Sequence, residues 1–520
     1  MAIPRMAYKM LEAVVGVEDI SEDPAVTYAY SINFPDDCVL PAFPPVNIQA
    51  VVLPESTEEV QAIVRICNEY KITYVPIGTH LGPWCTGGTI VIDPKKMNRF
   101  WIDERNMYAV LEPYTTHAQV QAEAMKKGLI HNTPTAGAHC SALCNFLFYG
   151  STLTAYSMGL SGRNVLGIEW VLPDGDLLKL GSLGSGAGWF CGDGPGPSLR
   201  SLMRGVCGNY GGLGMVTKIA IKLFPWAGPR IFPMSGVPPD YIAEFPEDQL
   251  KLFLVTFPSW EKMADFAYEI GKAEVGFSLW RLPPGGAARL MTTCNEGYND
   301  LWSTGLFQEE LGTHPRGTIL IVLQGSPAIP LDYEEKVLRQ IMAETGGKFP
   351  SEQLVNDIRK RYTPEVVRAY ICQAWTFMTG RYHAVKITWD SVDDAIAYGT
   401  SALALKKEYI EAGTLMDDGG DCCWVNSVDF THFGLEEQEY VYDPVSPESM
   451  KAALDITVRA SEDEFGKKVF ATISGDMANK LFGPQQSNVH IWMMKIKKAF
   501  DPNVLSNPPW FITPEEEKNP

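Results

Sequence analysis

Two hydrophobic periods alternate in the first part of the chain. Short apolar runs are typical of strands, and the segments between them have the i, i+3, i+4 spacing of amphipathic helices. Ser56, followed three positions later by Glu59, forms a capping box and predicts that one helix begins there. This alternation predicts an α+β or α/β arrangement. The expected strands are 50–53, 73–77, 89–92 and 108–112, and the expected helices are 56–70 and 116–127.

Residues 164–226 predict three strands joined by glycine-rich connections. The apolar run 165–172 meets Pro173-Asp174-Gly175, a turn signal because Pro presets φ and Gly adopts a positive φ. Further apolar runs follow at 176–180 and 215–223. Glycines just before a buried strand indicate that a flat or phosphorylated group approaches the backbone closely. These glycines are Gly205, Gly208, Gly211, Gly212 and Gly214.

After Pro229 the pattern changes. Residues 229–250 are rich in proline and predict irregular structure. A last helix is expected within 489–507, closed by Phe500-Asp501-Pro502. Other expected elements of this half are 258–271, 318–324, 331–345 and 447–460. The changes divide the chain into an N-terminal extension at 1–45, a first domain at 46–228, a second domain at 229–470 and a C-terminal segment at 471–520.

Composition and charge narrow the class of protein. A chain of 520 residues exceeds one ordinary core and predicts two or three domains. Hydrophobic residues make up 46% and charged residues 20%, as in soluble globular proteins. The net charge of −19 argues against binding nucleic acid, because phosphate backbones need a basic surface. It argues equally against an anionic membrane surface.

The termini and cysteines favour a reducing compartment. The N-terminus carries Arg5, Lys9 and Glu12 without a sustained apolar run, which is unlike a secretory signal. No run approaches the roughly 18 apolar residues of a membrane span. The 11 cysteines are scattered without a Cys-x-x-Cys pair, which favours free thiols. We therefore expect a cytoplasmic protein without a membrane span.

The order of these blocks resembles the FAD-binding family of vanillyl-alcohol oxidase and the flavoprotein subunit of p-cresol methylhydroxylase (PCMH). The resemblance covers 50–225 and includes IDPKKMN at 92–98, GIEWVLPDGDLLKLGS at 167–182 and GGLGMVTKIAIKLFP at 211–225. AFDPNVLSNP at 499–508 is similar to the family's closing motif. The resemblance implies an α+β fold, with a PCMH-type two-lobed FAD-binding domain at 46–228. It also implies a separate α+β substrate (cap) domain at 229–470 and a segment at 471–520 that returns to the FAD domain.

The resemblance also implies where FAD binds. The loop 78–88 is rich in glycine, and its amide groups can cradle a pyrophosphate as a backbone nest. No G-x-G-x-x-G motif opens a helix here, so a nicotinamide-binding Rossmann unit is not favoured. The stretch 211–216 is expected to bring the backbone close to the flavin. The candidate cofactor residues are Ile77, Gly78, Thr79, His80, Leu81, Gly82, Gly211, Gly212, Gly214, Val216 and Asn507.

His80 is the candidate for covalent attachment of the flavin. In relatives, a histidine in this loop carries a bond to the C8 methyl group of the isoalloxazine, and the Gly78-Thr79-His80 spacing fits that pattern. The alternative is a histidine that only hydrogen-bonds the loop or the pyrophosphate. Cys85 and His383 are lesser candidates for the same bond.

On the substrate side, the sequence departs from the phenol-oxidising relatives. Those proteins have an Asp near the flavin, whereas 145–168 contains no carboxylate here. They also anchor a phenolate with a Tyr-Arg pair near the C-terminus. The comparable stretch here reads Ser487-Asn488-Val489-His490 and keeps only the histidine. Oxidation of simple para-alkylphenols is therefore in doubt.

Four residues are the catalytic candidates: His490, Tyr382, Arg381 and His383. Arg381 could bind an anion, and the tyrosine and histidines could move a proton. The alternative for 380–383 is a strand carrying ordinary polar residues. The side chains of a second group could in principle bind a divalent metal: Asp417, Asp418, Asp421, Cys422, Cys423, Asp429 and His432. Because Asp-Asp-Gly-Gly is first of all a turn and no suitable His spacing is present, no metal is expected.

These features predict an FAD-dependent dehydrogenase or oxidase acting on CH-OH or CH-CH groups. A hydride would pass from an alcohol, benzylic or hydroxy-acid C–H of an aromatic or small organic substrate to flavin N5. One alternative is a 2-hydroxy-acid dehydrogenase that passes electrons to an iron–sulfur protein. Another is an electron-transfer subunit without its own substrate. The expected partners are a small-molecule substrate, an electron-acceptor protein (a cytochrome or iron–sulfur protein) and further copies of the chain in a homo-oligomer.

Overall fold

The computed structural model describes most of the chain, and the statements below concern the part it describes. The described residues are 3–31, 46–79, 85, 87–134, 138–148, 152–189, 198–203, 209, 211–231, 233–237, 240–244, 246–292, 294–326, 329–367, 383–417, 423–443, 445–467, 475–507 and 511–514.

A first, four-stranded sheet has the order β1-β2-β4-β3, in which β2, β4 and β3 run parallel. Its parallel strands are almost wholly buried, which explains why their sequences are apolar without alternation. Two helices, α1 and α3, pack into the same apolar core. The bounds are α1 Arg5–Val15, β1 Ile20–Ser21, α2 Pro24–Ser31, β2 Ala50–Val52, α3 Thr57–Tyr70, β3 Tyr74–Pro76 and β4 Ile90–Ile92.

Helix α3 begins where the capping signal placed it. The Ser56 hydroxyl accepts a hydrogen bond from the Glu59 N–H at 3.2 Å. The Glu59 carboxylate accepts from the N–H of Glu55 at 2.7 Å, one residue before the position expected of a capping box. Two hydrogen bonds therefore fix the start of α3. The second bond comes from the N–H of Glu55, whereas a regular capping box would use the N–H of Ser56.

A second, five-stranded antiparallel sheet follows in the order β5-β6-β10-β8-β9. Helix α16 from the far end of the chain packs on its core, where Phe500 stacks on Trp170 with ring centroids 5.4 Å apart. The bounds are β5 Phe100–Asp103, β6 Tyr108–Leu111, α4 His117–Lys126, β7 Leu129–Ile130, α5 Ala142–Phe148, α6 Ala155–Met158, β8 Val165–Val171, β9 Leu177–Leu180, β10 Met215–Lys222, β11 Phe224–Pro225, α15 Asp476–Phe482 and α16 Val489–Phe500.

A third, six-stranded sheet has the order β14-β16-β15-β18-β19-β17. Helices α7, α11 and α13 share one apolar core with it, and helices α8, α9, α10 and α12 share another. The bounds are β14 Lys251–Phe257, α7 Trp260–Lys272, β15 Ser278–Arg281, α8 Pro284–Leu290, α9 Asn295–Ser303, α10 Leu306–Glu310, β16 Gly317–Leu323, α11 Leu331–Thr345, α12 Glu352–Val367, β17 His383–Asp390, α13 Val392–Glu411, β18 Cys423–Val428, β19 Phe433–Tyr440 and α14 Pro447–Gly466.

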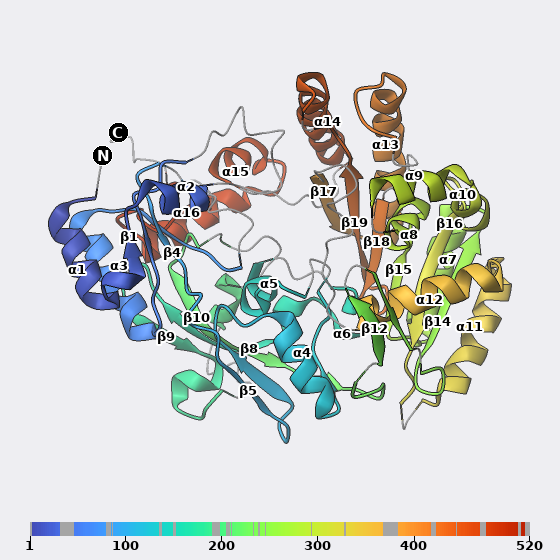
Figure 1. Cartoon of the computed structure of the whole chain (residues 1–520), viewed down its shortest axis with the longest axis horizontal. Helices are drawn as coiled ribbons and strands as arrows, with labels where there is room; N and C mark the ends of the chain where they lie inside the picture. Colours follow the sequence, from blue (N-terminus) through green and yellow to red (C-terminus); the bar gives the residue numbers. More distant parts are fainter. Residues whose placement is uncertain are drawn as a thin grey trace.

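Figure 1 shows how these layers are arranged. Helices α1, α3, α15 and α16 lie on one side of the molecule, the third sheet lies on the other, and α4, α5 and α6 lie between them. Helix α6 joins the two sides, because Tyr156 and Met158 belong to the two cores of the third sheet. We call the side with the first two sheets the cofactor lobe and the side with the third sheet the cap. Among the helices described, none is both long and apolar enough to cross a membrane.

The expected fold class is confirmed, since the chain is a mixed helix and sheet structure. Helix α11 has the expected bounds, and the expected strands are present within one or two residues at each end. The expectation of irregular structure at 229–250 is wrong. Two short strands, β12 Met234–Val237 and β13 Asp240–Ala243, pair antiparallel within it.

Candidate functional site

Strand β3 ends in the segment that the sequence assigns to the pyrophosphate. After Pro76 the chain continues through Ile77, Gly78 and Thr79. The Ser141 N–H, just before α5, donates to Thr79 Oγ1 at 2.7 Å. A Cβ on Gly78 would lie only 2.5 Å from Cys144 Sγ, so only glycine fits between β3 and α5. The loop after β3 and the start of α5 therefore meet.

The glycine loop before β10 joins the same place. Gly211 has φ +71° and Gly214 has φ +85°, conformations that favour glycine. Their packing also requires glycine, since a Cβ would lie 2.6 Å from Pro76 Cδ at Gly211, 2.2 Å from Phe511 Cβ at Gly212 and 2.2 Å from the Val171 carbonyl oxygen at Gly214. Packing within the protein thus accounts for these glycines, and their contact with a flavin stays a prediction. Val216 is buried in β10 opposite Trp170.

A buried lysine ties the C-terminal segment to this loop. The Lys497 ammonium, in the last turn of α16, donates to the carbonyl oxygens of Gly212 at 2.6 Å and Ser506 at 2.5 Å and to the Asp501 carboxylate at 2.6 Å. Burial lowers the pKa of Lys497, and the attraction of Asp501 opposes this shift. Asp501 in turn accepts from the N–H groups of Leu505 and Ser506.

The segment after Asp501 then adds a short parallel bridge beside β3. The Tyr74 N–H donates to the Leu505 carbonyl at 3.0 Å, and the Asn507 N–H donates to the Tyr74 carbonyl at 2.9 Å. The Ser506 hydroxyl accepts from the Gly214 N–H at 2.8 Å and donates to the Gly211 carbonyl at 2.6 Å. Four segments, at 77–79, 140–145, 209–216 and 505–507, thus form one site in the cofactor lobe.

A buried pair of histidines lies next to this site. His117 Nδ1 and His131 Nε2 are 3.1 Å apart, and both side chains are fully buried. Their other ring nitrogens have no hydrogen bond of normal geometry among the described residues. Burial lowers the pKa of His131 to about 4. Burial and the neighbouring His131 hold the pKa of His117 well below its usual value, against the side chain of Asn145.

Buried polar groups continue from the histidines toward α6. Asn132 donates to the Gly159 carbonyl at 2.9 Å and accepts from the Asn164 amide at 2.8 Å. Thr133 accepts from Gln121 at 3.2 Å. We call these residues, with His117, His131 and Asn145, the polar layer. Asn145 is buried in this layer, and its side chain lies close enough to His117 to act on the pKa of that imidazole.

The catalytic candidates fall in different places. His490 is buried in the first turn of α16 and packs against Gly483, where a Cβ would lie 2.2 Å from His490 Nδ1. It is seven residues, roughly 10 Å along the helix, from Lys497. His383 begins β17, and its backbone pairs with Tyr440 of β19. Other candidates lie outside the described residues, namely Arg381, Tyr382, His80, Leu81 and Gly82.

Sequence reasoning missed a buried ion pair next to β17. Arg289 of α8 and Glu439 of β19 are 2.9 Å apart, and both side chains are almost fully buried. Glu439 pairs with Ala384, so the ion pair lies beside the strand that begins at His383. The two residues are 150 positions apart in sequence, and no local pattern joins them. For Lys497 and Asp501, by contrast, the i, i+4 spacing on an apolar helix face was a usable signal.

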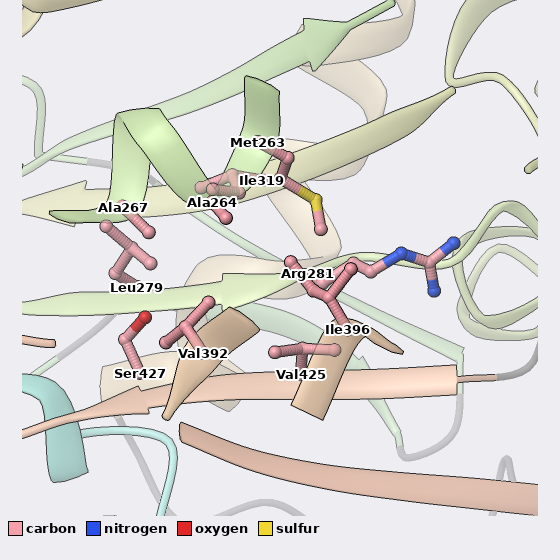
Figure 2. Close-up of a pocket in the computed structure, with 10 residues that line it drawn as sticks. All are labelled: Met263, Ala264, Ala267, Leu279, Arg281, Ile319, Val392, Ile396, Val425 and Ser427. Atoms are coloured by element: carbon pink, nitrogen blue, oxygen red, sulfur yellow. The ribbon is translucent and has the colours of Figure 1, made fainter. Parts of the chain in front are cut away.

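A small cavity in the cap does not resemble a substrate site. It lies between α7, α13 and the third sheet, has room for about one water molecule and is lined mainly by apolar side chains. Figure 2 shows the Arg281 guanidinium directed away from these apolar side chains. That group lies 4.3 Å from the centre of the Trp260 ring.

The acidic, cysteine and histidine residues at 417–432 of the cap are candidate metal ligands. Among the residues that the structure describes, no group of three or more His, Cys, Asp or Glu side chains is placed to hold a metal ion. Of the residues weighed in the sequence, Asp418, Asp421 and Cys422 lie outside this part of the chain.

Comparisons with known proteins agree with the geometry. Residues 48–181 match the model of an FAD binding domain. The chain is 31% identical over 188 residues to glycolate oxidase subunit GlcD of Bacillus subtilis, which covers 34% of this chain and 37% of that protein. It is 29% identical over 254 residues to the flavoprotein subunit of 4-cresol dehydrogenase (hydroxylating) of Pseudomonas putida, covering 45% and 47%. The matches thus span less than half the length of these relatives.

A solved structure extends the likeness to the whole chain. Substrate-bound p-cresol methylhydroxylase superposes with a TM-score of 0.74 at 17% identity, covering 98% of this chain and 97% of that one. At this identity the likeness shows the fold. Residues 48–181 therefore match an FAD binding domain, the whole chain has the fold of a PCMH-type structure, and its homologues are FAD-linked oxidoreductases. The converging glycine-bearing backbone segments fit a cofactor that carries phosphate, because successive backbone amide groups can form an anion-binding nest.

The buried lysine provides a test of how the site is held together. Replacing Lys497 by Met leaves Asp501 charged and buried without a cation, so unfolding free energy should fall by about 3–5 kcal/mol. Urea unfolding of the wild type and the variant measures this loss. Lys262→Met removes a half-exposed partner of Asp265 and should cost less than about 1 kcal/mol. Equal losses in the two variants would contradict the assigned role of Lys497.

The histidine pair provides a pH test. Because the folded pKa of His131, about 4, is below the unfolded value of 6.5, the unfolded chain binds more protons between these pH values. Stability is therefore intact above pH 6.5 and falls as the pH drops toward 4, by on the order of 3 kcal/mol. His131→Gln should flatten this part of the stability profile. His139→Gln, which replaces an exposed histidine of the same lobe, should leave it unchanged. Parallel profiles for wild type and His131→Gln would refute the prediction.

Proposed function

We propose that this chain is an FAD-dependent dehydrogenase or oxidase. It would remove a hydride from an alcohol, benzylic or hydroxy-acid carbon of an aromatic or small organic substrate. The observation that carries the proposal is the convergence of 77–79, 140–145, 209–216 and 505–507 around the matched FAD binding domain. When bound, FAD supplies the hydride acceptor.

The chain's own residues would bind and orient the cofactor. Backbone groups of Gly78 and Thr79 are proposed to hold the pyrophosphate, together with His80, Leu81 and Gly82. The hydrogen bond from the Ser141 N–H to Thr79 Oγ1 supports this, because it fixes the loop after β3 against the start of α5. The Lys497 contacts would fix the loop at 211–214 and Asn507 beside the flavin.

The substrate side would be formed by the start of β17 and its neighbours. Arg381, Tyr382 and His383 are proposed to bind the polar end of the substrate and to take its proton, with His490 as a further candidate base. The buried Arg289–Glu439 pair supports this placement, since a paired charge is held close to the strand that carries these residues. The proposed boundaries, a cofactor domain at 46–228 and a cap at 229–470, are consistent with where the three sheets lie.

A second candidate is 2-hydroxy-acid oxidation with transfer of electrons to an iron–sulfur protein or cytochrome. The names of relatives support it, among them glycolate oxidase subunit GlcD and mitochondrial D-lactate dehydrogenase [cytochrome] of Arabidopsis thaliana. A subunit that only transfers electrons is disfavoured by the large cap. We also propose a cytoplasmic location, supported by the thiols of Cys67, Cys85, Cys144 and Cys294, which form no disulfide within the described residues.

An anaerobic substrate screen should identify the reaction. The purified protein should absorb near 450 nm, as flavins do, and one class among 4-alkylphenols, aromatic alcohols and 2-hydroxy acids should bleach it. Bleaching by aromatic alcohols supports the first candidate, and bleaching by 2-hydroxy acids supports the second. If no small molecule bleaches the flavin but a reduced partner protein does, both enzyme proposals fail.

Covalent attachment through His80 can be tested on denaturing gels. If the bond forms, flavin fluorescence should remain in the protein band after acid denaturation and disappear in His80→Ala. His139→Ala, in the same lobe, should keep the fluorescence. Flavin that washes out of the denatured wild type would end the covalent hypothesis. Fluorescence that persists in His80→Ala would move the bond to Cys85 or His383.

A further inference from the structure

The turn between β18 and β19 has an unusual backbone. Asp429, Phe430 and Thr431 are consecutive and have φ values of +49°, +51° and +67°. Residues other than glycine rarely adopt this left-handed region, and three in a row are strained. Such a conformation persists only where the surroundings hold it, and strained backbone tends to occur at functional positions.

Contacts with the cofactor lobe hold the turn. The N–H groups of Asp429 and Phe430 donate to the carbonyl oxygens of Ala155, at 3.1 Å, and Tyr156, at 2.7 Å, in α6. The left-handed backbone directs two successive amide groups at one helix. The Phe430 ring also packs edge-on against Tyr156, with centroids 5.1 Å apart.

Side chains reinforce the same contact. Arg163, just before β8, forms an ion pair with Asp429 and lies 5.3 Å from the centre of the Phe433 ring. A Cβ on Gly159 would lie 2.4 Å from Asp429 Oδ1, so the turn is seated directly on the chain that follows α6. On the cap side, the Thr431 hydroxyl donates to the Ala267 carbonyl of α7 at 2.8 Å.

The turn connects two parts of the proposed site. Strand β19 runs from this turn to Glu439 and Tyr440, which lie beside β17. Helix α6 follows α5, whose start contacts the Gly78–Thr79 loop. The contact between the turn and α6 therefore lies on a short path from the cofactor loop to the substrate-side strands.

We propose that the turn at 429–432 is a clamp that fixes the position of the cap over the cofactor lobe, with Asp429 and Arg163 as positioning residues. The inference rests on the proposed function, because it assigns the cap the substrate side of the reaction. In this role the strained backbone is retained because it directs two amide groups at α6 and, at the same time, the Asp429 carboxylate at Arg163.

Asp429→Asn combined with Arg163→Gln tests the clamp. Asn tolerates the left-handed backbone, so the variant removes the charges and keeps the turn. Because small misplacements of a reacting group are costly, kcat/KM with the substrate found in the screen should fall on the order of tenfold. The spectrum of the bound flavin should stay unchanged. Glu335→Gln, which removes ion pairs with Lys251 and Arg339 inside the cap, is the matched control and should leave kcat/KM unchanged.

A second readout does not depend on turnover. Spin labels on unnatural amino acids at the exposed Val17 and Val445 report the distance between the cofactor lobe and the cap. The wild type and Glu335→Gln should give one narrow distribution, and the double variant a broader or shifted one. An unchanged distribution in the double variant overturns the clamp, whatever its kcat/KM. If the wild type oxidises no substrate, the proposed function fails while the distance distribution still decides the clamp.

Discussion

The buried ammonium of Lys497 is the interaction on which the cofactor lobe depends. A buried cation is unfavourable unless acceptors surround it. Here two carbonyl oxygens and the Asp501 carboxylate accept its hydrogen bonds, and they belong to the loop before β10 and to the segment after α16. Because displacing either segment would leave the buried ammonium without one of its acceptors, both segments are held in one arrangement. The Ser506 hydroxyl is hydrogen-bonded to Gly211 and Gly214, so it holds the loop before β10 in the same arrangement. The residues on either side of Ser506 are hydrogen-bonded to Tyr74 of β3.

Helix α6 plays the corresponding role between the lobes. Its sequence belongs to the first predicted domain, yet Tyr156 and Met158 are buried in the cores of the cap. The Tyr156 hydroxyl donates to the Val275 carbonyl at 2.7 Å, and Ser157 donates to the Phe277 carbonyl at 2.7 Å. Because these α6 residues complete the apolar cores of the cap, separating the two lobes would expose apolar side chains to water and is unfavourable. Helix α6 thus precedes the proposed boundary at 228 in sequence but packs into the cap.

Local signals decided what could be predicted from the sequence. Helix α11 was predictable because Pro330 and Gly346 mark its ends, and β8 and β9 because Pro-Asp-Gly separates two apolar runs. The site was predictable as far as glycines and the closing motif revealed it. The Arg289–Glu439 pair was not, because its partners meet only once six strands are in register. The pairing of His117 with His131 likewise depends on how α4 and β7 pack, and no spacing rule encodes it.

The side chains of the polar layer are hydrogen-bonding groups that carry no formal charge at neutral pH. Burial keeps His117 and His131 neutral at neutral pH, since a buried imidazolium would lack a compensating charge. Asn132, Thr133 and Asn145 add hydrogen-bonding groups without charge, and 145–168 contributes no carboxylate. The polar layer of the cofactor lobe thus provides uncharged hydrogen-bonding groups for a ligand that binds next to it. Next to the proposed substrate side, the cap holds the buried Arg289–Glu439 ion pair. Arg381, which precedes β17 in the sequence, would add a further cation there. Selection of a substrate by its charge would therefore depend on the cap, and a change of substrate would require changes there.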